Sequence, residues 1–187
     1  MRTQVILNAE NGLIDLDGLT HLPSAPPAPL NATGLVRVFL EPTLVISTGI
    51  HSGPVIMDIE VFESAPDEDG AVEWEDVVEF TAAHTPGAVV ALHGAYEVPP
   101  EGASVTLPGD PSTVRLRVSA TGRDIDYDLS VDESSERYLV QIWPAPDSDQ
   151  RVIASISTNS RRPTRLEPFP PNSVTTGSVL GHHRSRP

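Results

Sequence analysis

The stretch from Val114 to Pro146, VRLRVSATGRDIDYDLSVDESSERYLVQIWPAP, decides the fold class. Its first eight residues alternate: every second position from Val114 to Ala120 is apolar, and the positions between them are polar. Side chains on a β-strand point alternately to opposite faces, so this run predicts a strand with one apolar and one charged face. A helix would need apolar residues three and four positions apart, which this run lacks.

The second half of the stretch predicts another strand. From Tyr138 to Trp143 both parities are apolar except at Gln141, which is typical of a central strand covered on both faces. Pro144 and Pro146 end it, because proline has no N–H to give to a neighbouring strand. Gly122 ends the first strand, so the acidic residues between the two runs form their connection.

Similar signals recur along the chain. Asn11-Gly12 lies between two apolar runs and predicts a hairpin over residues 4–16, because both residues tolerate positive φ. Further strands are predicted at Leu35–Phe39, Thr43–Ser47, Val55–Glu63, Trp74–Phe80, Ala88–His93 and Val152–Ser157. About eight or nine strands, with turn signals roughly every ten residues, are typical of antiparallel sheets, and we predict an all-β antiparallel β-sandwich.

The length of 187 residues favours one domain, which we place at residues 1–158. Residues 22–30, LPSAPPAPL, form a Pro-rich crossing segment within it. Residues 159–187 are rich in Pro and Arg and poor in large apolar side chains, so we predict a disordered tail. One core should contain Val55, Met57, Ile59, Val61, Val114, Leu116, Val118, Val140 and Ile142.

Arg115 and Arg117 have the opposite parity to this core, so they should point away from it. We expect their partners to be carboxylates on a neighbouring strand, with Asp58 or Glu60 as candidates.

Charge and composition restrict the function. The net charge is −14, and residues 151–187 alone carry six Arg against one Glu. An acidic body repels phosphates, so we expect a protein partner of basic character and no nucleic acid. There is no Cys, and all 12 basic residues are Arg, which excludes thiolate and lysine chemistry. No apolar leader or membrane-length run is present, so we expect a cytoplasmic protein without membrane contact.

No sequence motif for catalysis is found. The phosphate-binding glycine loops, the nucleophile-elbow serine and zinc-type His spacing are all missing. We therefore expect no catalytic residue, no cofactor and no enzymatic activity.

Three acids, Asp124, Asp126 and Asp128, are weak candidates for a metal site. An EF-hand loop beginning at Asp124 would need Gly at Leu129 and Glu at Ser135, so that loop is excluded. The solvated face of an edge strand or a loop is the simpler interpretation.

Five further residues are candidates for binding a protein partner. Asp67, Glu68 and Asp69 lie in an acidic turn, and Trp74 and Trp143 are large aromatic residues. An aromatic side chain exposed among acids marks an interface hot spot, whereas in a sandwich most such side chains belong to the core.

Three segments carry a family resemblance: WEDVVEF (74–80), VRLRVSATGRD (114–124) and YLVQIWPAP (138–146). Together they resemble a family of small actinobacterial β-rich proteins, and the match covers about residues 35–146. The family carries no assigned activity, so the resemblance implies a fold alone. The layout of strands is also similar to that of competence protein J, a β-rich nuclease inhibitor, which is an analogy of fold.

Three functions are compatible with these features. The first is a non-catalytic acidic protein-binding module, immunity- or inhibitor-like toward a basic protein such as a nuclease. The alternative is a structural or assembly component that docks through its Pro/Arg-rich tail. The third is an Asp-based metal-binding protein or enzyme that uses Asp124–Asp128.

Overall fold

The computed structural model describes residues 2–22, 33–38, 43–67, 73–95 and 97–161 of the chain. The predicted all-β class is confirmed, and the described residues contain no α-helix. The described ranges form eleven strands, more than expected: β1 (Arg2–Ala9), β2 (Leu13–His21), β3 (Val36–Val38), β4 (Thr43–Ser47), β5 (Gly53–Val61), β6 (Asp76–His84), β7 (Val90–Gly94), β8 (Ser104–Val105), β9 (Thr113–Thr121), β10 (Arg137–Pro144) and β11 (Arg151–Ser155). A 3-10 helix, η3 (Asn159–Arg161), follows β11.

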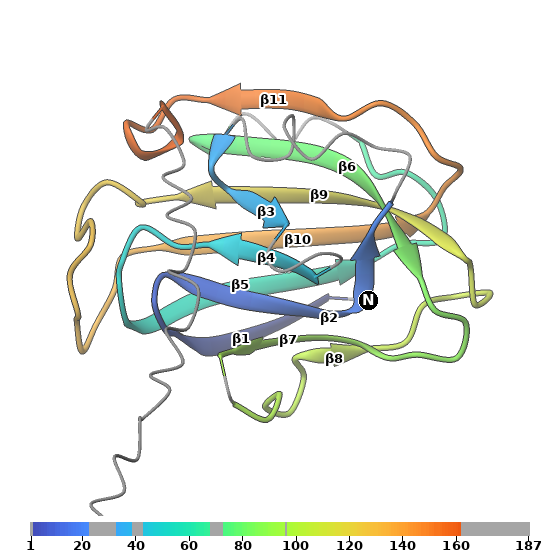
Figure 1. The fold of residues 1–187 in the computed structure, drawn as a ribbon, viewed down its shortest axis with the longest axis horizontal. Coiled ribbons are helices and arrows are strands. Elements are labelled where there is room, and N and C mark those ends of the chain that lie inside the picture. The colour runs from blue at the N-terminus through green and yellow to red at the C-terminus, as the bar shows by residue number, and fades with distance from the viewer. Residues whose placement is uncertain (1, 23–32, 39–42, 68–72, 96, 162–187) are drawn as a thin grey trace, which may run out of the picture.

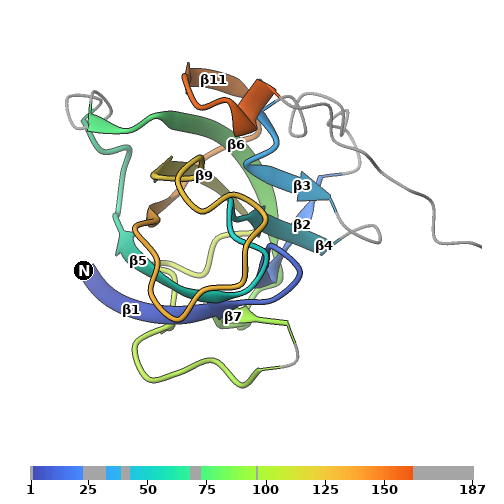
Figure 2. The same cartoon turned by 90° about the vertical axis from the view of Figure 1, so that its left-hand side faces the viewer.

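All strands belong to one sheet, in the order β1-β5-β10-β9-β6-β2-β4-β3 (Figure 1). Every pairing between named strands is antiparallel except that of β5 with β10, which is parallel. The sheet also branches, because β11 pairs with the first half of β6, and β7 pairs with the first half of β2. Viewed from the end, the sheet curls until β1 and β7 lie side by side (Figure 2).

The curled sheet encloses one apolar core. Eight of the nine predicted core residues are buried in it, and the ninth, Val61, is half-buried and packs against it. The alternation seen in the sequence explains this: on β9, Val114, Leu116 and Val118 all point to the inner face and are fully buried.

The turn of the predicted hairpin over residues 4–16 is present, but the two strands that it joins do not pair with each other beyond the turn. Asn11 and Gly12 have φ of 53° and 71°, and Glu10 bridges to Leu13. Beyond this bridge β1 pairs with β5, and β2 pairs with β4. The segment after β4 holds the turn, because the Gly12 N–H donates to the His51 carbonyl at 2.7 Å and the Thr48 N–H donates to the Gly12 carbonyl.

Arg115 and Arg117 pair with a carboxylate on a neighbouring strand, as predicted, but the residues suggested for that role, Asp58 and Glu60, are wrong. Both arginines lie on the face opposite the core, but they are only 3% and 4% exposed and pair with Glu79 on β6. Strand β9 has β6 and β10 as its neighbours, so β10 separates it from Asp58 and Glu60 on β5.

The first three residues of the predicted tail have regular structure. Residues 159–161 form η3, and Asn159 is bonded to the carboxylate of Asp124. Residues 162–187, like most of the Pro-rich segment, lie outside the described residues. Within the described part of the chain, no helix is long and apolar enough to cross a membrane.

Candidate functional site

The connection between β9 and β10, residues 122–136, combines exposed acids with exposed apolar side chains, and we call it the acidic loop. Ile125, Tyr127 and Leu129 are 67%, 37% and 55% exposed. They are three of the eight large apolar residues that are exposed in the described part of the chain. Five acids accompany them: Asp124, Asp126, Asp128, Asp132 and Glu133. An apolar group rimmed by polar residues is the composition of an interaction surface.

Local turns explain why these apolar residues are exposed. The alternating run D-I-D-Y-D-L would suit a strand, but Gly122 has a φ of +83° and turns the chain at its start. The Ile125 N–H then donates to the Gly122 carbonyl, and the Leu129 N–H donates to the Asp126 carbonyl. Because the chain folds back on itself twice, no inner face forms that could bury the apolar side chains.

The acidic loop is fastened to the segment that joins β4 and β5. The Asp128 N–H donates to the Gly49 carbonyl at 2.8 Å, and the His51 N–H donates to the Leu129 carbonyl at 2.8 Å. The Val131 N–H donates to the Ser52 carbonyl at 2.9 Å. These bonds fix the backbone of the loop, so the exposed side chains are presented by a rigid support.

A buried carboxylate, that of Glu136, holds the C-terminal end of the acidic loop. Glu136 accepts hydrogen bonds from the Gly49 N–H at 3.1 Å, the Ile50 N–H at 2.6 Å and the Tyr138 hydroxyl. Burial raises the pKa of Glu136, and the three donors together with the charge of Arg123 offset part of that rise. Burial and the neighbouring Glu136 also raise the pKa of Tyr138 well above its usual value.

A buried ion pair holds the N-terminal end of the acidic loop. The guanidinium of Arg123 donates to Asp76 at 2.8 Å, and both side chains are almost fully buried. Asp76 also accepts bonds from the Ile156 and Ser157 N–H groups and from the Ser157 hydroxyl. This cluster joins the acidic loop to β6 and to the chain that follows β11.

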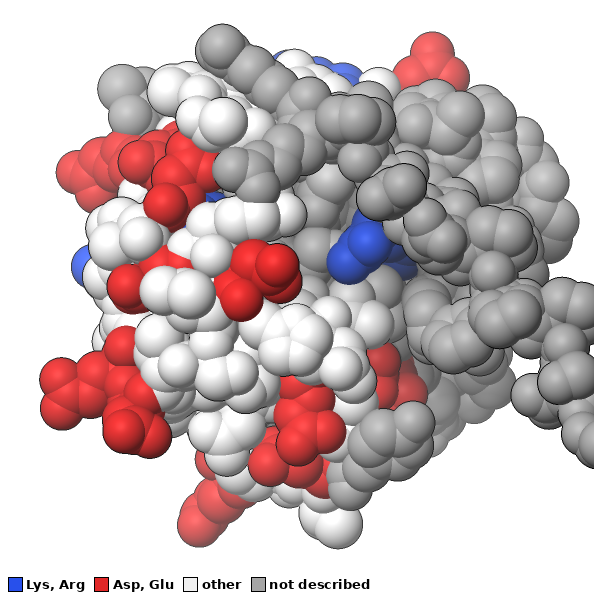
Figure 3. Space-filling view, turned by 60° about the vertical axis from the view of Figure 1, so that its left-hand side comes forward, with Lys and Arg blue, Asp and Glu red and all other residues white. Residues whose placement is uncertain are grey.

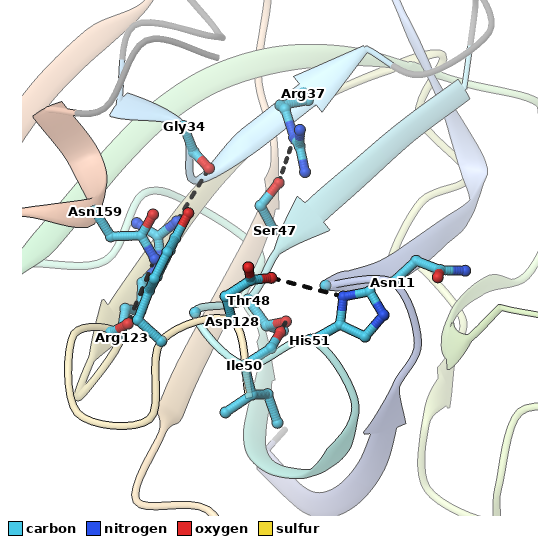
Figure 4. Close-up of a pocket in the computed structure, with 13 residues that line it drawn as sticks. Asn11, Gly34, Arg37, Ser47, Thr48, Ile50, His51, Arg123, Asp128 and Asn159 are labelled. Atoms are coloured by element: carbon cyan, nitrogen blue, oxygen red, sulfur yellow. Dashed lines mark hydrogen bonds and ion pairs between the residues drawn. The ribbon is translucent and has the colours of Figure 1, made fainter. Parts of the chain in front are cut away.

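A pocket of about 260 Å³ opens beside the acidic loop. Figure 4 shows the residues that line it: Asn11 and Gly12, Gly34 and Arg37, residues 47–51, Asn159, and Arg123, Tyr127 and Asp128 of the acidic loop. Arg37 and Arg123 both line the pocket, and the Arg37 Nε donates to the Ser47 hydroxyl. Burial lowers the pKa of Arg37, and the nearby charge of Arg123 lowers it further. At the rim, the Asp128 carboxylate lies 3.7 Å from the His51 ring.

The three acids suggested for a metal site do not converge. Asp124 uses both carboxylate oxygens to accept the Thr158 and Asn159 N–H groups at 2.6 and 2.8 Å, and these bonds outweigh desolvation and lower its pKa. Asp128 faces His51 instead. Among the described residues, no group of three or more His, Asp or Glu side chains could hold a metal ion.

The residues suggested for protein binding differ in exposure, and two of them, Asp67 and Trp143, both contact Arg117. Asp67 is exposed, Trp74 is half-buried, and Glu68 and Asp69 lie outside the described residues. Trp143 is only 4% exposed, and its ring centroid lies 5.5 Å from the guanidinium of Arg117. A ring stacked in this way contributes cation–π energy inside the protein and offers little surface to a partner.

Sequence reasoning missed Ile125 and Leu129, and it did not include Tyr127 among the candidates for binding a protein partner. The available signal was Gly122, which ends β9 and places the apolar residues that follow it in an acid-rich turn.

Comparisons with known proteins show a likeness of fold only. No protein-family model matches the chain, so the resemblance to an actinobacterial family gains no support, and no curated protein matches either. Two solved structures are similar. ComJ from Bacillus subtilis, an inhibitor of the DNA-degrading activity of NucA, is 9% identical with a TM-score of 0.45, and the match covers 76% of this chain and 96% of ComJ. Crocagin biosynthetic gene J is 12% identical with a TM-score of 0.43, and the match covers 78% of this chain and 98% of that one.

Proposed function

We propose that this protein is a non-catalytic binding module that uses the acidic loop to bind a basic protein, in the manner of an inhibitor or immunity protein. The observation that carries the proposal is the group of Ile125, Tyr127 and Leu129, exposed between carboxylates on a loop whose backbone is fixed. A buried apolar centre with a polar rim is the arrangement that supplies most of the affinity in protein interfaces.

The rigid attachment of the loop supports this function. Ordering a flexible loop on binding costs free energy, and this cost is reduced when the loop is already held in place. Here the hydrogen bonds to Gly49, His51 and Ser52 hold the loop in the free protein. The exposed apolar area can therefore contribute to affinity, and little binding free energy is lost to ordering of the loop.

The charge distribution supports a basic partner. Arg115 and Arg117 are buried against the single carboxylate of Glu79, and Arg123 is buried against Asp76, so none of the three adds an exposed positive charge to the surface. The face of the molecule shown in Figure 3 is rich in exposed carboxylates. A field of one sign speeds the encounter with a partner of opposite charge and weakens as salt is added.

The test begins with capture of partners from the native host at low and high salt, followed by purification of the candidate complex. Affinity is then compared for the double variant Ile125→Ser/Leu129→Ser and for Ile6→Ser, a control on β1 that is equally exposed at 66%. We expect the double variant to weaken binding at least about 30-fold, as for a hot spot, and the control to change it less than about 2-fold.

Two results would contradict the proposal. One is a double variant that is folded and binds as tightly as the wild type. The other is a partner of acidic character whose affinity does not change with salt concentration.

A further inference from the structure

Arg37 differs from the other arginines of the described chain. Each of the others whose side chain is described lies within 4.0 Å of a carboxylate: Arg2, Arg115, Arg117, Arg123, Arg137 and Arg151. For Arg37 the described residues provide no such carboxylate, although the chain carries 26 acids. Its Nε donates to the Ser47 hydroxyl, and its side chain lines the pocket beside the acidic loop.

A half-buried guanidinium without a counter-charge is unfavourable, because it loses hydration without gaining an ionic partner. A second guanidinium, that of Arg123, lines the same pocket, but it is paired with the buried carboxylate of Asp76. The pocket therefore contains one guanidinium, that of Arg37, for which the described residues supply no carboxylate, and an anion would balance its charge.

The local charges favour a singly charged anion. Arg123 is neutralised by Asp76 at 2.8 Å, which leaves Arg37 as the net positive charge inside the pocket. The carboxylate of Asp128, with its side chain 74% exposed, stands at the rim and repels a group that carries two negative charges. A single carboxylate balances Arg37 with the smallest repulsion from Asp128.

We propose that this pocket binds one carboxylate group, of a small organic acid or of a peptide, with Arg37 as its charged ligand. The planar guanidinium fork matches a carboxylate in a two-point contact. The Ser47 hydroxyl accepts the Arg37 Nε–H, and its own proton stays available as a further donor. This proposal does not depend on the acidic loop binding a protein.

The experiment follows the Nε–H resonance of Arg37 by NMR in the full chain. Sodium acetate, sodium phosphate and sodium chloride are titrated separately at constant ionic strength and near pH 7. We expect a saturable shift with acetate, with a Kd on the order of 1–10 mM, and only the common salt effect with chloride. A saturable response to phosphate that is tighter than the response to acetate would overturn the assignment to a single carboxylate.

Two short peptides distinguish the sources of the carboxylate. N-acetyl-dialanine with a free C-terminus is compared with the same peptide as its amide. Binding of the free acid at least about 10-fold tighter than acetate identifies a peptide terminus, and equal affinity identifies a small organic acid. Binding of the amide as tightly as the free acid would overturn the proposal.

Variants assign the site to Arg37, and the acetate response is then read from the backbone amides of residues 47–51. Arg37→Gln should weaken acetate binding at least about 10-fold, and Arg37→Lys should weaken it less, because it keeps the charge and loses the fork. Arg137→Gln, at an arginine 52% exposed on β10, is the control and should leave binding unchanged. An equal loss in the control would contradict the proposal. If Arg37→Gln fails to fold, the peptide and phosphate titrations of the wild type still test whether the pocket binds a single carboxylate.

Discussion

At the scale of the residue, His93 shows how one side chain links charge to stability. Its Nε2 lies 2.9 Å from the Asp17 carboxylate, its Nδ1 lies 2.8 Å from the Gly94 carbonyl, and Asp15 is 4.0 Å away. Burial lowers the pKa of His93, but the bond to Asp17, the Gly94 carbonyl and the two negative charges outweigh burial, so the pKa is raised. Both ring nitrogens face acceptors, which favours the doubly protonated ring.

The raised pKa of His93 predicts a pH-dependent contribution to stability. A histidine whose pKa is higher in the folded state than in the unfolded state stabilises the fold fully below about pH 6.5, and this contribution is lost as pH rises through the folded-state pKa. His93→Gln should therefore cost more at pH 5.5 than at pH 8.5. Urea unfolding of both proteins at the two pH values measures this difference, and a cost that grows with pH would contradict it.

Gly49 is a second position where one residue decides local structure. A Cβ built there would lie 2.0 Å from the Arg123 carbonyl oxygen and 2.5 Å from the Glu136 carboxylate. Gly49→Ala should destabilise the protein by about 1–3 kcal/mol or more, because backbone atoms must move to admit the methyl group. Gly109→Ala is a control for the clash, since nothing lies within 4 Å of a Cβ there, although its φ of +71° adds some strain. Thermal unfolding compares the two, and equal losses would show that the close packing at Gly49 is unimportant.

At the scale of the element, β6, β9 and β10 are joined by more than their backbone bonds. Glu79 on β6 accepts from Arg115 at 2.9 Å and from Arg117 at 3.0 Å, and Trp143 on β10 packs against Arg117. The segment after β10 covers this cluster, where the carbonyls of Ser148 and Asp149 accept from Arg115. On the outer face of β6, β9 and β10, the buried charged groups are thus paired with one another or hydrogen-bonded to carbonyl groups.

Removal of the central acid tests this cluster. Glu79→Gln leaves two buried guanidinium groups without their carboxylate, so it should cost about 3–5 kcal/mol at pH 7. The arginines lower the pKa of Glu79 despite its burial, so its contribution is present above about pH 4.5 and is lost as pH falls through the folded-state pKa. Chemical unfolding should show the cost of the variant shrinking in acid. A cost that is unchanged at pH 3 would contradict this explanation.

The same elements show what sequence could and could not predict. Alternation depends only on the residues of one strand, so it located β5, β9 and β10 and their core residues. Pairing depends on distant segments: the parallel contact of β5 with β10 and the partner of Arg115 arise from strands far apart in the chain. The acidic loop could be placed between two strands, but the turns that expose Ile125 depend on Gly122 and on bonds to residues 49–52.

At the scale of the whole molecule, buried arginine charges are separated from carboxylates at the surface. Most described arginines are paired with carboxylates, three of them inside the protein, while many acids remain at the surface of a chain with net charge −14. The acidic loop adds an exposed apolar centre to that surface, at the end of the curled sheet that faces the viewer in Figure 2. One end of the molecule therefore combines electrostatic attraction with apolar area, the two requirements for fast and tight binding of a basic protein.

Hydrogen exchange of the protein with and without the proposed basic partner, once that partner is purified, tests the central claim most directly. The proposed interface predicts that the partner slows exchange of backbone amides in residues 122–136, where Ile125 and Leu129 are exposed. It also predicts unchanged exchange at Ile6 on β1, a site of similar exposure that serves as the internal control. Slowed exchange confined to other parts of the surface, with residues 122–136 unchanged in the saturated complex, would contradict the claim that the acidic loop is the binding surface.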